Sequence, residues 1–474
     1  MLESLKQTIE DNFSFRPNKN QFRDIERLTF EIMRREKIHL NQIIDYLKNN
    51  SKAAKCSGKD KFFAIKNSLL NRRFPLTTNK EKIDAKRIFL TQLKKPLLDK
   101  WQVNPIRDKS SETTTTSLMR ISNGVNKEFN PLKVFVEKEV RKSYLVDNFK
   151  KMFPQVEMEE LSYYSEYLKK NKFHISQLKK SIVFIVKEKW DFIKPCPCTK
   201  HHLSCGYWIF NLGFGCPFDC SYCFLQQYTN FPGLILPANL DDFFEKFDRF
   251  AGKLKKPIRI GTGEFCDSLA LDDITQYSSK LIPYFKEKNV SFELKTKSTQ
   301  IDNLLKIKSS PNIVISWSLN PPSIIEKEEL ATASLEERIE AAGKAQTAGF
   351  GVGFHFDPII HFQDWKNQYK EVICQLYSKV KPPFAWISLG TLRSNRELKT
   401  IVESRFPQSN IFYGELLLGE DKKLRYPRFL RKEIYSKLIE WIREYDTKTL
   451  VYLCMENKEM WEILGLLRNT TAPF

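Results

Sequence analysis

The stretch Gly215-Cys216-Pro217-Phe218-Asp219-Cys220-Ser221-Tyr222-Cys223 holds three of the ten cysteines of the chain. Its C-x3-C-x2-C spacing supplies three thiolates to one metal centre within eight residues. Most iron–sulfur clusters held by cysteine use four thiolates, so a site with three leaves one iron free to bind another ligand. A structural zinc site more usually offers paired C-x2-C units. The spacing therefore predicts a 4Fe–4S cluster with one open position, held by Cys216, Cys220 and Cys223.

This three-cysteine site resembles that of the radical S-adenosylmethionine (SAM) superfamily. In those enzymes SAM binds the fourth iron through its amino and carboxylate groups. The resemblance therefore implies two cofactors, the 4Fe–4S cluster and S-adenosyl-L-methionine.

Length and composition limit the class of protein. A chain of 474 residues exceeds what one hydrophobic core usually organises, so we expect two domains with a linker. There is no run of 18 apolar residues, and the N-terminus MLESLKQTIEDNF lacks an apolar segment, so neither a membrane span nor a signal peptide is expected. Ten cysteines in such a chain favour metal and thiol chemistry over disulfides, and we expect a cytoplasmic protein.

The chain is strongly basic, with 77 Lys and Arg against 57 Asp and Glu and a net charge of +20. Residues 1–100 alone carry 23 basic and 12 acidic residues, a net charge of +11. This concentration favours a polyanionic partner, most simply nucleic acid, over a merely solvated basic surface.

Residues 1–103 read as a basic helical extension, a candidate nucleic-acid-binding region. Apolar residues follow helical spacing in 25–33 and 40–47, and a basic helix is expected over 61–73. Three short helices with a basic last helix suit a helix-turn-helix-like module, and an ordinary helical extension is the alternative. Residues 104–130 are expected to be a linker, because Lys109–Ser117 has neither periodicity nor an apolar anchor.

Residues 131–474 are expected to form one α/β domain. Short strands are expected at 134–136 and 181–186, with a helix at 144–152 between them. Further strands alternate with helices such as 334–348 and 364–380, which implies a parallel sheet with right-handed crossovers. Six such units suit a partial, open (β/α)6 radical-SAM barrel, with catalytic residues at the carboxyl ends of the strands. The six strands are expected at 207–212, 258–261, 291–295, 313–318, 351–356 and 385–389.

The order of several segments resembles the spore photoproduct lyase family within the radical SAM superfamily. The likeness covers roughly residues 131–474, and residues 1–130 lie outside it. Besides the cysteine loop up to Gln227, it rests on Ile260–Ala270, Leu294–Lys297, Ile315–Pro321, Gly353–Pro358 and Ile387–Thr391.

The resemblance implies a DNA-repair lyase that acts on the methylene-bridged thymine dimer. In that family a 5′-deoxyadenosyl radical from reduced SAM abstracts hydrogen from the lesion, the bridge fragments, and a cysteine thiol quenches the remaining thymine radical. We expect damaged DNA as the partner, flavodoxin or ferredoxin as the electron donor, and a monomer. The alternative is an enzyme of the same family acting on a different nucleic-acid or small-molecule substrate. A non-enzymatic iron–sulfur protein would have no use for residues that bind SAM.

Two candidate catalytic residues follow from the resemblance. Cys266 matches the hydrogen-donor cysteine, which suits a weak thiol S–H bond, although a lone cysteine is more often a small buried hydrophobe. Tyr222 matches a tyrosine that relays the radical after the thiol has reacted. Phe224 stands where many of these lyases carry a second tyrosine, so this chain departs from a two-tyrosine relay.

The resemblance also implies the residues that contact SAM. The turn Gly261-Thr-Gly-Glu264 stands where the amino group is held, with Glu264 as an acceptor, because glycines let backbone approach a ligand closely. Ser268, Lys297 and Ser318 match further contacts, and a lysine suits the SAM carboxylate as a point charge.

Arg425 and Tyr426 match a pair on the lesion side of a hairpin in that family, inside a basic and aromatic stretch that suits phosphate contacts and base stacking. An exposed turn before a helix over 432–444 is the alternative.

Two further ligand-rich segments have other interpretations. The segment with Cys196, Cys198 and Cys205 is interpreted as structural thiols, with a second metal as the alternative, because its spacing matches no zinc template. His355, Asp357 and His361 are expected to form hydrogen bonds rather than a metal site. Cys56, Cys374 and Cys454 have no context that suggests a role.

Overall fold

The computed structural model describes residues 2–80, 119–122, 126–171, 182–189, 192–198, 202–229 and 231–467. The chain divides into two compact units. We call residues 1–114, 393–399 and 408–431 the helical unit, and residues 115–392, 400–407 and 432–474 the sheet unit. The expected linker segment Lys109–Ser117 lies outside the described residues.

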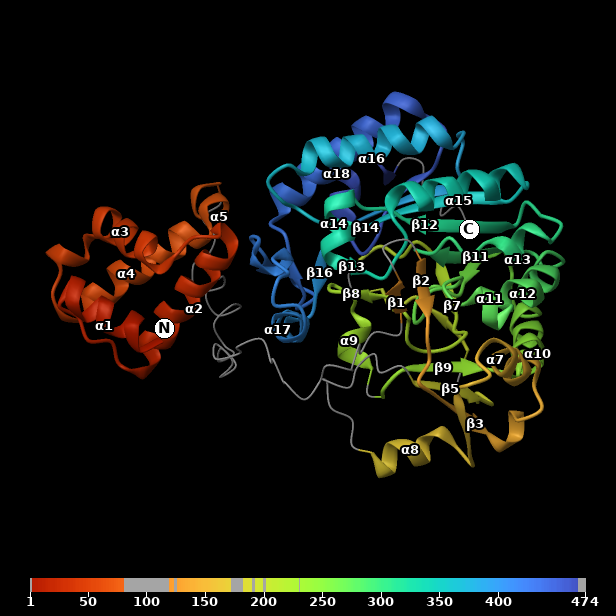
Figure 1. Cartoon of the computed structure of the whole chain (residues 1–474). Coiled ribbons are helices and arrows are strands. Elements are labelled where there is room, and N and C mark those ends of the chain that lie inside the picture. The colour runs from red at the N-terminus through yellow and green to blue at the C-terminus, as the bar shows by residue number, and fades with distance from the viewer. Residues whose placement is uncertain are drawn as a thin grey trace. The chain divides into compact units, whose positions relative to one another are not determined.

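The helical unit begins with five helices (Figure 1). Asn18 starts α2 by accepting hydrogen bonds from the backbone N–H groups of Asn20 and Gln21, and Lys37 ends it in a left-handed conformation. The buried apolar residues recur at helical spacing, as Leu5, Ile9 and Phe13 do on the first helix. The helices are α1 (Leu2–Phe13), α2 (Lys19–Glu36), α3 (Leu40–Asn50), α4 (Gly58–Arg73) and α5 (Pro75–Lys80), with a 3-10 turn η1 (Lys52–Lys55).

The helical unit also contains a small antiparallel sheet from the C-terminal third of the chain. Its strand order is β16-β18-β17, with β16 at Arg393–Ser394, β18 at Leu424–Arg425 and β17 at Leu417–Leu418. Leu417 packs against the core of the helices. This sheet was expected to belong with residues 131–474, whereas its contacts are with the N-terminal helices.

An eight-stranded sheet forms the centre of the sheet unit, in the order β19-β15-β14-β12-β11-β10-β7-β6. All neighbours are parallel except the edge strand β6. The strands are β6 (Ile193–Pro195), β7 (Tyr207–Phe210), β10 (Ile258–Gly261), β11 (Val290–Thr296), β12 (Ile313–Ser318), β14 (Gly351–Ile359), β15 (Trp386–Thr391) and β19 (Val451–Leu453).

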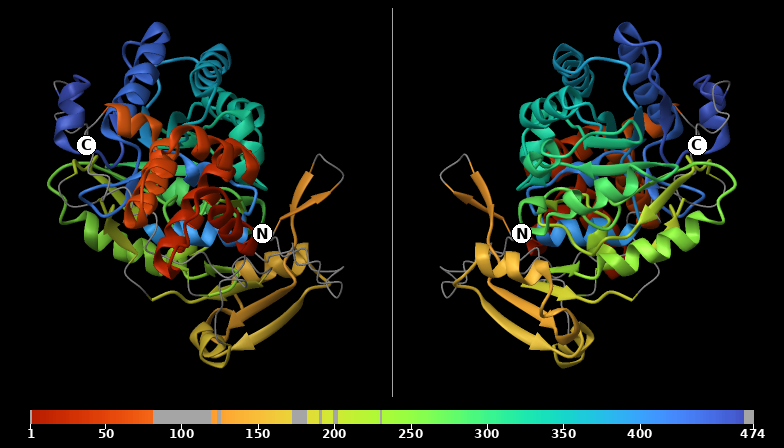
Figure 2. Two further views of the ribbon diagram at one scale, coloured as in Figure 1. Left: turned by 90° about the vertical axis from the view of Figure 1, so that its left-hand side faces the viewer. Right: turned by 90° about the vertical axis from the view of Figure 1, so that its right-hand side faces the viewer.

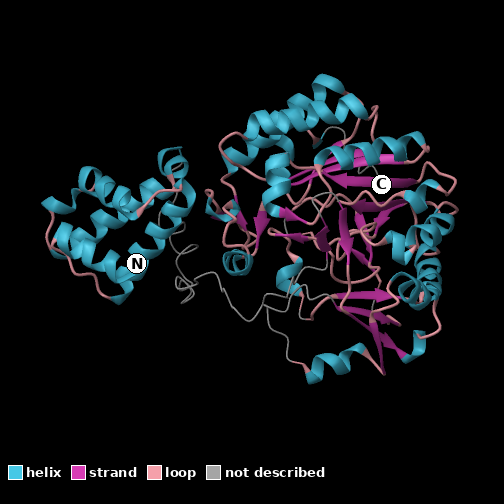
Figure 3. Ribbon diagram, viewed as in Figure 1, coloured by secondary structure: helices cyan, strands magenta, loops and turns pink. Residues whose placement is uncertain are grey.

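Helices that join the parallel strands, such as α15 (Leu335–Thr347) and α16 (Trp365–Lys379), cover the outer side of the curled sheet (Figure 3). α15 begins at a capping box in which Ser334 accepts from the Glu337 N–H and the Glu337 carboxylate accepts from the Ser334 N–H. The helices are α10 (Leu240–Ala251), α11 (Asp272–Thr275), α12 (Tyr277–Phe285), α13 (Asp302–Leu305), α14 (Pro322–Glu328), α15 (Leu335–Thr347), α16 (Trp365–Lys379), α17 (Arg396–Arg405), α18 (Arg428–Tyr445) and α19 (Lys458–Ile463).

A second, parallel sheet of four strands has the order β4-β3-β5-β9. Its strands are β3 (Lys133–Glu137), β4 (Glu157–Leu161), β5 (Ile182–Val186) and β9 (Leu234–Pro237), with α7 (Tyr144–Met152) and α8 (Tyr164–Lys170) between them. Within the expected linker 104–130, β1 (Met119–Ser122) and β2 (Asn126–Phe129) form an antiparallel hairpin that projects from this part of the unit (Figure 2).

The α/β class is confirmed, and each of the six expected strands lies in the large sheet. The parallel part also contains β19, which the sequence pattern did not reveal because a strand of three residues is too short to show a periodicity. No helix among the described residues is long and apolar enough to cross a membrane.

Candidate active site

The cysteine loop follows β7 and is held in place by backbone geometry. Gly215 has a φ of 88°, and a Cβ added there would lie 2.8 Å from the carbonyl oxygen of Gly233. After it, β8 (Asp219–Cys220) pairs antiparallel with β13 (Glu329–Leu330). The Gln226 amide donates to the carbonyl oxygens of Cys220 and Ser221 at 3.2 and 2.9 Å. A glycine is therefore required where the loop passes close to a neighbouring backbone.

The three cysteines influence one another electrostatically. Burial raises the pKa of the Cys220 thiol, Lys297 opposes this, and Cys223 and Cys216 raise the pKa further. No group of three or more Cys, His, Asp or Glu side chains among the described residues is arranged around a single metal ion. An iron–sulfur cube binds its thiolates at separate corners, which stand further apart than the ligands of one ion. Three neighbouring thiols, one of them close to Lys297, are therefore compatible with three corners of a cluster.

Cys266 lies in the loop after β10 and beside the cysteine loop. The Gly215 N–H donates to the Phe265 carbonyl at 3.0 Å, which joins the two loops directly. Burial raises the pKa of the Cys266 thiol, and the nearby Cys216 raises it further. The Cys266 sulfur lies 3.5 Å from the carbonyl oxygen of Thr262. The thiol is therefore held in its protonated form, close to the cysteine loop.

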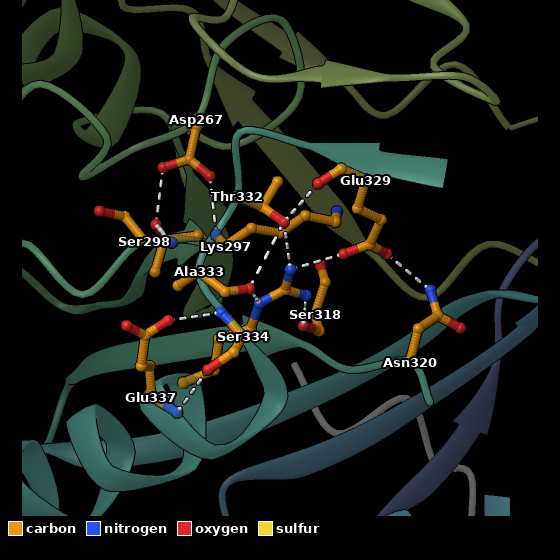
Figure 4. A network of polar contacts seen from close by, with 12 residues as sticks. Asp267, Lys297, Ser298, Ser318, Asn320, Glu329, Thr332, Ala333, Ser334 and Glu337 are labelled. Carbon is orange, nitrogen blue, oxygen red and sulfur yellow. Dashed lines mark hydrogen bonds and ion pairs between the residues drawn. The ribbon is translucent and has the colours of Figure 1, made fainter. Parts of the chain in front are cut away.

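Tyr222 is buried, and its hydroxyl donates to the carboxylate of Glu329. The same carboxylate accepts from the Asn320 amide at 2.8 Å and from the Arg338 guanidinium at 2.6 Å. Figure 4 shows this network, with Glu329 between Asn320 and the guanidinium. Burial raises the pKa of Tyr222, and the Glu329 carboxylate raises it further. Sequence reasoning missed Glu329 and Arg338, because neither belongs to a recognisable spacing.

Lys297 stands at the carboxyl end of β11, between the cysteine loop and Glu329. Burial alone would lower the pKa of its amine, but Glu329 and Cys220 raise it above the usual value. The Asp267 carboxylate accepts from the Lys297 N–H at 2.8 Å and from the Thr296 hydroxyl at 2.6 Å (Figure 4). The loop after β10 thus positions the lysine, which remains a cation next to the cysteine sulfurs.

Ser318 and Ser268 have different surroundings. The Ser318 hydroxyl is buried and has no hydrogen-bond partner among the described residues, while its carbonyl accepts from Arg338 at 2.8 Å. Buried polar groups are nearly always hydrogen-bonded, so a lone hydroxyl at the end of β12 indicates room for a ligand. The Ser268 hydroxyl instead accepts from Thr262 Oγ1 at 2.7 Å and the Lys295 N–H at 3.0 Å, which ties two strand ends together.

A model of the spore photoproduct lyase family matches residues 131–450. The matched region includes every candidate catalytic, cofactor-binding and metal-binding residue. The chain belongs to the spore photoproduct lyase family. The expected family is thereby confirmed, as is the expectation of a radical SAM lyase.

Two curated relatives are themselves named spore photoproduct lyases. The protein of Clostridium acetobutylicum is 27% identical over 263 residues, which cover 55% of this chain and 75% of that protein. The protein of Bacillus subtilis is 25% identical over 231 residues, which cover 47% of this chain and 66% of that protein.

Solved structures of spore photoproduct lyase share the fold. One, complexed with dinucleoside spore photoproduct, has a TM-score of 0.59 at 21% identity and covers 68% of this chain and 99% of that chain. Another, a mutant with bound AdoMet and dinucleoside spore photoproduct, has a TM-score of 0.60 at 20% identity and covers 70% and 99%. Since nearly all of each solved chain is matched, the rest of this chain has no counterpart in those structures.

Arg425 and Tyr426, the predicted nucleic-acid contacts, lie in the helical unit and remain a prediction. The Arg425 side chain is buried and forms a salt bridge with Asp421, which it contacts through Nε at 3.1 Å. Tyr426 is fully buried, and a Cβ on Gly414 would lie 3.5 Å from its ring. Within this basic and aromatic stretch, Arg425 and Tyr426 thus have internal contacts, whereas Lys422 and Arg428 are exposed.

Phe224, at the position of the second tyrosine in many family members, is exposed, and its ring lies edge-on to that of Tyr228 at 5.9 Å. His355 binds the Glu293 carboxylate at 2.7 Å, and burial together with Lys295 lowers the pKa of His355 to about 4. His355 thus forms a hydrogen bond inside the sheet, as expected.

The second cysteine segment, with Cys196, Cys198 and Cys205, has a further thiol nearby, that of Cys454. A hydrogen bond to Cys198 and burial raise the pKa of Cys196, and Glu264 and Cys454 raise it further. Cys454, which had no assigned context, is therefore a neighbour of Cys196. Glu264 also raises the pKa of Tyr207. Glu264 therefore lies near Tyr207 and Cys196, close to the second cysteine segment. None of these residues belongs to a described group suited to a metal ion.

Proposed function

We propose that this protein is a radical SAM DNA-repair lyase that reverses the methylene-bridged thymine dimer of the spore photoproduct type. The observation that carries the proposal is the direct backbone link between the cysteine loop and the loop of Cys266. It brings the candidate cluster ligands and the candidate hydrogen donor into one site, in a chain whose family acts on this lesion.

The residues fit two cofactors. Cys216, Cys220 and Cys223 would hold a 4Fe–4S cluster, and Lys297 and the partnerless Ser318 hydroxyl would contact SAM, with Glu264 and Ser268 nearby. Bound together, these groups supply the reducing electron and the 5′-deoxyadenosyl radical. We infer that the curled sheet is the partial (β/α)6 barrel of the radical SAM superfamily, with β19 added at its edge.

Cys266 is the proposed hydrogen-atom donor to the thymine radical. Its raised pKa keeps the S–H bond in place at neutral pH, and the protonated thiol is the form that donates a hydrogen atom. After donation the sulfur carries the unpaired electron and must be reduced before the next turnover.

Tyr222 is the proposed relay that restores Cys266. Its hydroxyl hydrogen-bonds to the Glu329 carboxylate, which orients the phenol. Transfer of the phenol hydrogen atom to the Cys266 thiyl would restore the S–H bond and leave the unpaired electron on Tyr222. Because Phe224 has no hydroxyl, this chain would use one tyrosine where many relatives have two.

Damaged DNA is the proposed partner, with a flavodoxin- or ferredoxin-type electron donor, and we propose a monomer in the cytoplasm. The basic helical unit supports a polyanionic partner. The alternative, a different nucleic-acid or small-molecule substrate, is favoured by Phe224, the departure from the two-tyrosine pattern.

The deciding experiment uses anaerobically reconstituted, reduced protein and a synthetic dinucleotide lesion. We expect cleavage of SAM and release of two thymines. SAM cleavage without thymine release would select the alternative substrate. Failure to assemble a four-iron centre, or to cleave SAM, would overturn the radical SAM assignment itself.

A further inference from the structure

Glu31 in the helical unit is a buried carboxylate surrounded by three cations. Its side chain is 1% exposed, and its oxygens accept from Arg27 Nε at 2.7 Å, Lys399 Nζ at 2.7 Å and Arg73 Nε at 2.9 Å. Burial alone would raise the pKa of Glu31, but Lys399 and the two arginines hold it well below its usual value. Lys399 follows Glu31 by 368 residues, so this cluster joins the N-terminal helices to a segment far along the chain.

A second buried carboxylate strengthens the same junction. Glu415 accepts the backbone N–H groups of Leu76 and Thr77 at 2.9 and 2.8 Å. Both terminal nitrogens of Arg73 donate to the Gly414 carbonyl at 3.2 Å. The ring of Tyr413 contacts Phe30 edge-on at 5.9 Å. Residues 393–399 and 408–431 are thus built into the helical unit by charge, hydrogen bonds and apolar contacts.

Buried charges of this kind are costly to desolvate, and their best-attested use is to fix one arrangement of the parts that they join. We call the set Glu31, Arg27, Arg73 and Lys399 the carboxylate lock. It joins the N-terminal helices and the C-terminal segments in one compact body, although the family match at 131–450 covers only the latter.

This body carries most of the positive charge of the chain. Its three segments contain 33 Lys and Arg and 18 Asp and Glu, a net charge of +15 out of +20 for the whole chain. Residues 393–399 and 408–431 contribute +4 of this net charge. The positive charge is therefore found on both sets of segments that the carboxylate lock joins. Such a concentration attracts polyanions and speeds their association.

Part of that charge is available to a partner. Lys48, Lys52, Lys55 and Lys59 lie between the end of α3 and the start of α4, and all four are exposed. None of them forms an ion pair with a described residue, in contrast to Lys66, which pairs with Asp24 at 3.2 Å. We call these four residues the lysine turn; Asp60 at its end is the sole acid in 46–60.

We propose that the helical unit binds the phosphate backbone of double-stranded DNA. The lysine turn makes the phosphate contacts, and the carboxylate lock keeps the turn in a fixed position relative to residues 393–431 of the same unit. Duplex is favoured over single strand because residues 47–60 contain no aromatic side chain, and single-strand binding usually combines charge with aromatic stacking. Contacts of this kind position a protein on DNA without reading sequence. The lesion as substrate rests on the proposed function.

The first test compares two double variants of the full-length holoprotein that remove the same charge. Lys52→Gln/Lys55→Gln changes the lysine turn, and Lys255→Gln/Lys256→Gln changes two exposed lysines that precede β10 in the sheet unit. Binding to an undamaged duplex is measured at several salt concentrations. We expect the lysine-turn variant to bind more weakly, with a slope of log K against log salt shallower by roughly 1.8, about 0.9 for each lost phosphate contact.

The control variant is expected to keep the wild-type slope. Equal losses in the two variants would mean that only total charge matters and would overturn the lysine turn as the contact. Tighter binding of single strand than of duplex by the wild type would overturn the choice of duplex.

The second test addresses the lock. Lys399→Met removes the link to the C-terminal segments but leaves Glu31 paired with two arginines, whereas Lys399→Arg keeps the charge. We expect weaker duplex binding in the methionine variant, recovery in the arginine variant, and release of thymines from a dinucleotide in both. Wild-type duplex affinity in a folded Lys399→Met protein would remove the lock from the proposal. If the wild type binds duplex with a steep salt slope yet releases no thymine, the inference stands and the proposed function fails.

Discussion

At the scale of single residues, the hydrogen bond between Tyr222 and Glu329 contributes to the stability of the fold and also holds the proposed relay tyrosine in place. The tyrosine hydroxyl hydrogen-bonds to a carboxylate that also compensates Arg338. A relay residue needs a fixed position and a hydroxyl hydrogen to give, and this pair offers both. The exposed Phe224 offers neither, because its ring has no hydroxyl and contacts Tyr228 at the surface.

We expect Tyr222→Phe to lower the free energy of unfolding by about 1 kcal/mol, because a buried carboxylate oxygen loses one of its two donors and keeps Asn320. Repeated turnover should slow while SAM cleavage persists. The matched control is Tyr228→Phe, which removes a hydroxyl from an exposed ring. Thermal unfolding and thymine release measured on both variants check this; equal behaviour of the two would contradict a special role for Tyr222.

Cys266→Ala should leave SAM cleavage intact and reduce thymine release by about tenfold or more, a change of at least about 1.4 kcal/mol in transition-state free energy. The reason is that alanine has no S–H bond to donate. Product analysis by chromatography gives the measurement, with Cys374→Ala, an exposed cysteine on α16, as the control. Unaltered thymine release would exclude the thiol as donor.

At the scale of elements, the cysteine loop depends on a glycine rather than on the cysteines alone. Gly215→Ala adds a Cβ that would lie 2.8 Å from a backbone oxygen, at a φ of 88°. Gly206→Ala is matched, because φ is 75° there and nothing lies within 4 Å. Both variants carry the left-handed strain of about 1–2 kcal/mol. We expect iron content per chain after anaerobic reconstitution to fall for Gly215→Ala alone; equal iron loading would show that the loop adjusts.

The interior of the large sheet predicts a pH dependence. His355 has a folded-state pKa of about 4, below the usual 6.5, because burial and Lys295 disfavour its charged form. As pH falls from 6.5 to 4, the unfolded chain takes up a proton that the folded chain does not, so stability is lost across this window, by up to roughly 3 kcal/mol. Unfolding midpoints in denaturant at pH 7 and pH 5 should differ less in His355→Gln. An identical pH difference in both proteins would contradict this.

At the scale of the whole molecule, the N-terminal helices are part of a unit that includes residues 393–399 and 408–431. Deletion of residues 1–103 would leave Lys399 and Glu415 without their partners and expose Leu417. We expect the truncated protein to lose thermal stability, since breaking a buried ion pair costs about 3–5 kcal/mol. Differential scanning calorimetry measures this; an unchanged transition would mean that the helices are a detachable extension.

Much of the fold follows from local pattern. The six strands and the helices 144–152, 334–348 and 364–380 were predicted within a few residues. In such segments the spacing of the apolar residues indicates both the type of element and its buried face. The helix expected over 432–444 begins earlier, at Arg428, and β19 was missed because it is short. The predicted DNA contacts Arg425 and Tyr426 are buried, which the sequence did not reveal, because basic and aromatic residues look alike in sequence whether they face a partner or the protein interior.

The sequence by itself determined the set of candidate cluster ligands, because three cysteines within eight residues are neighbours in any fold. It also determined the alternation of strands and helices. Only the tertiary structure decided that Tyr222 meets Glu329, 107 residues away, and that Glu31 meets Lys399, 368 residues away. The physical reason is that a buried charge or hydroxyl takes its partner from whichever segment the fold brings within hydrogen-bond distance, and no local spacing records that choice.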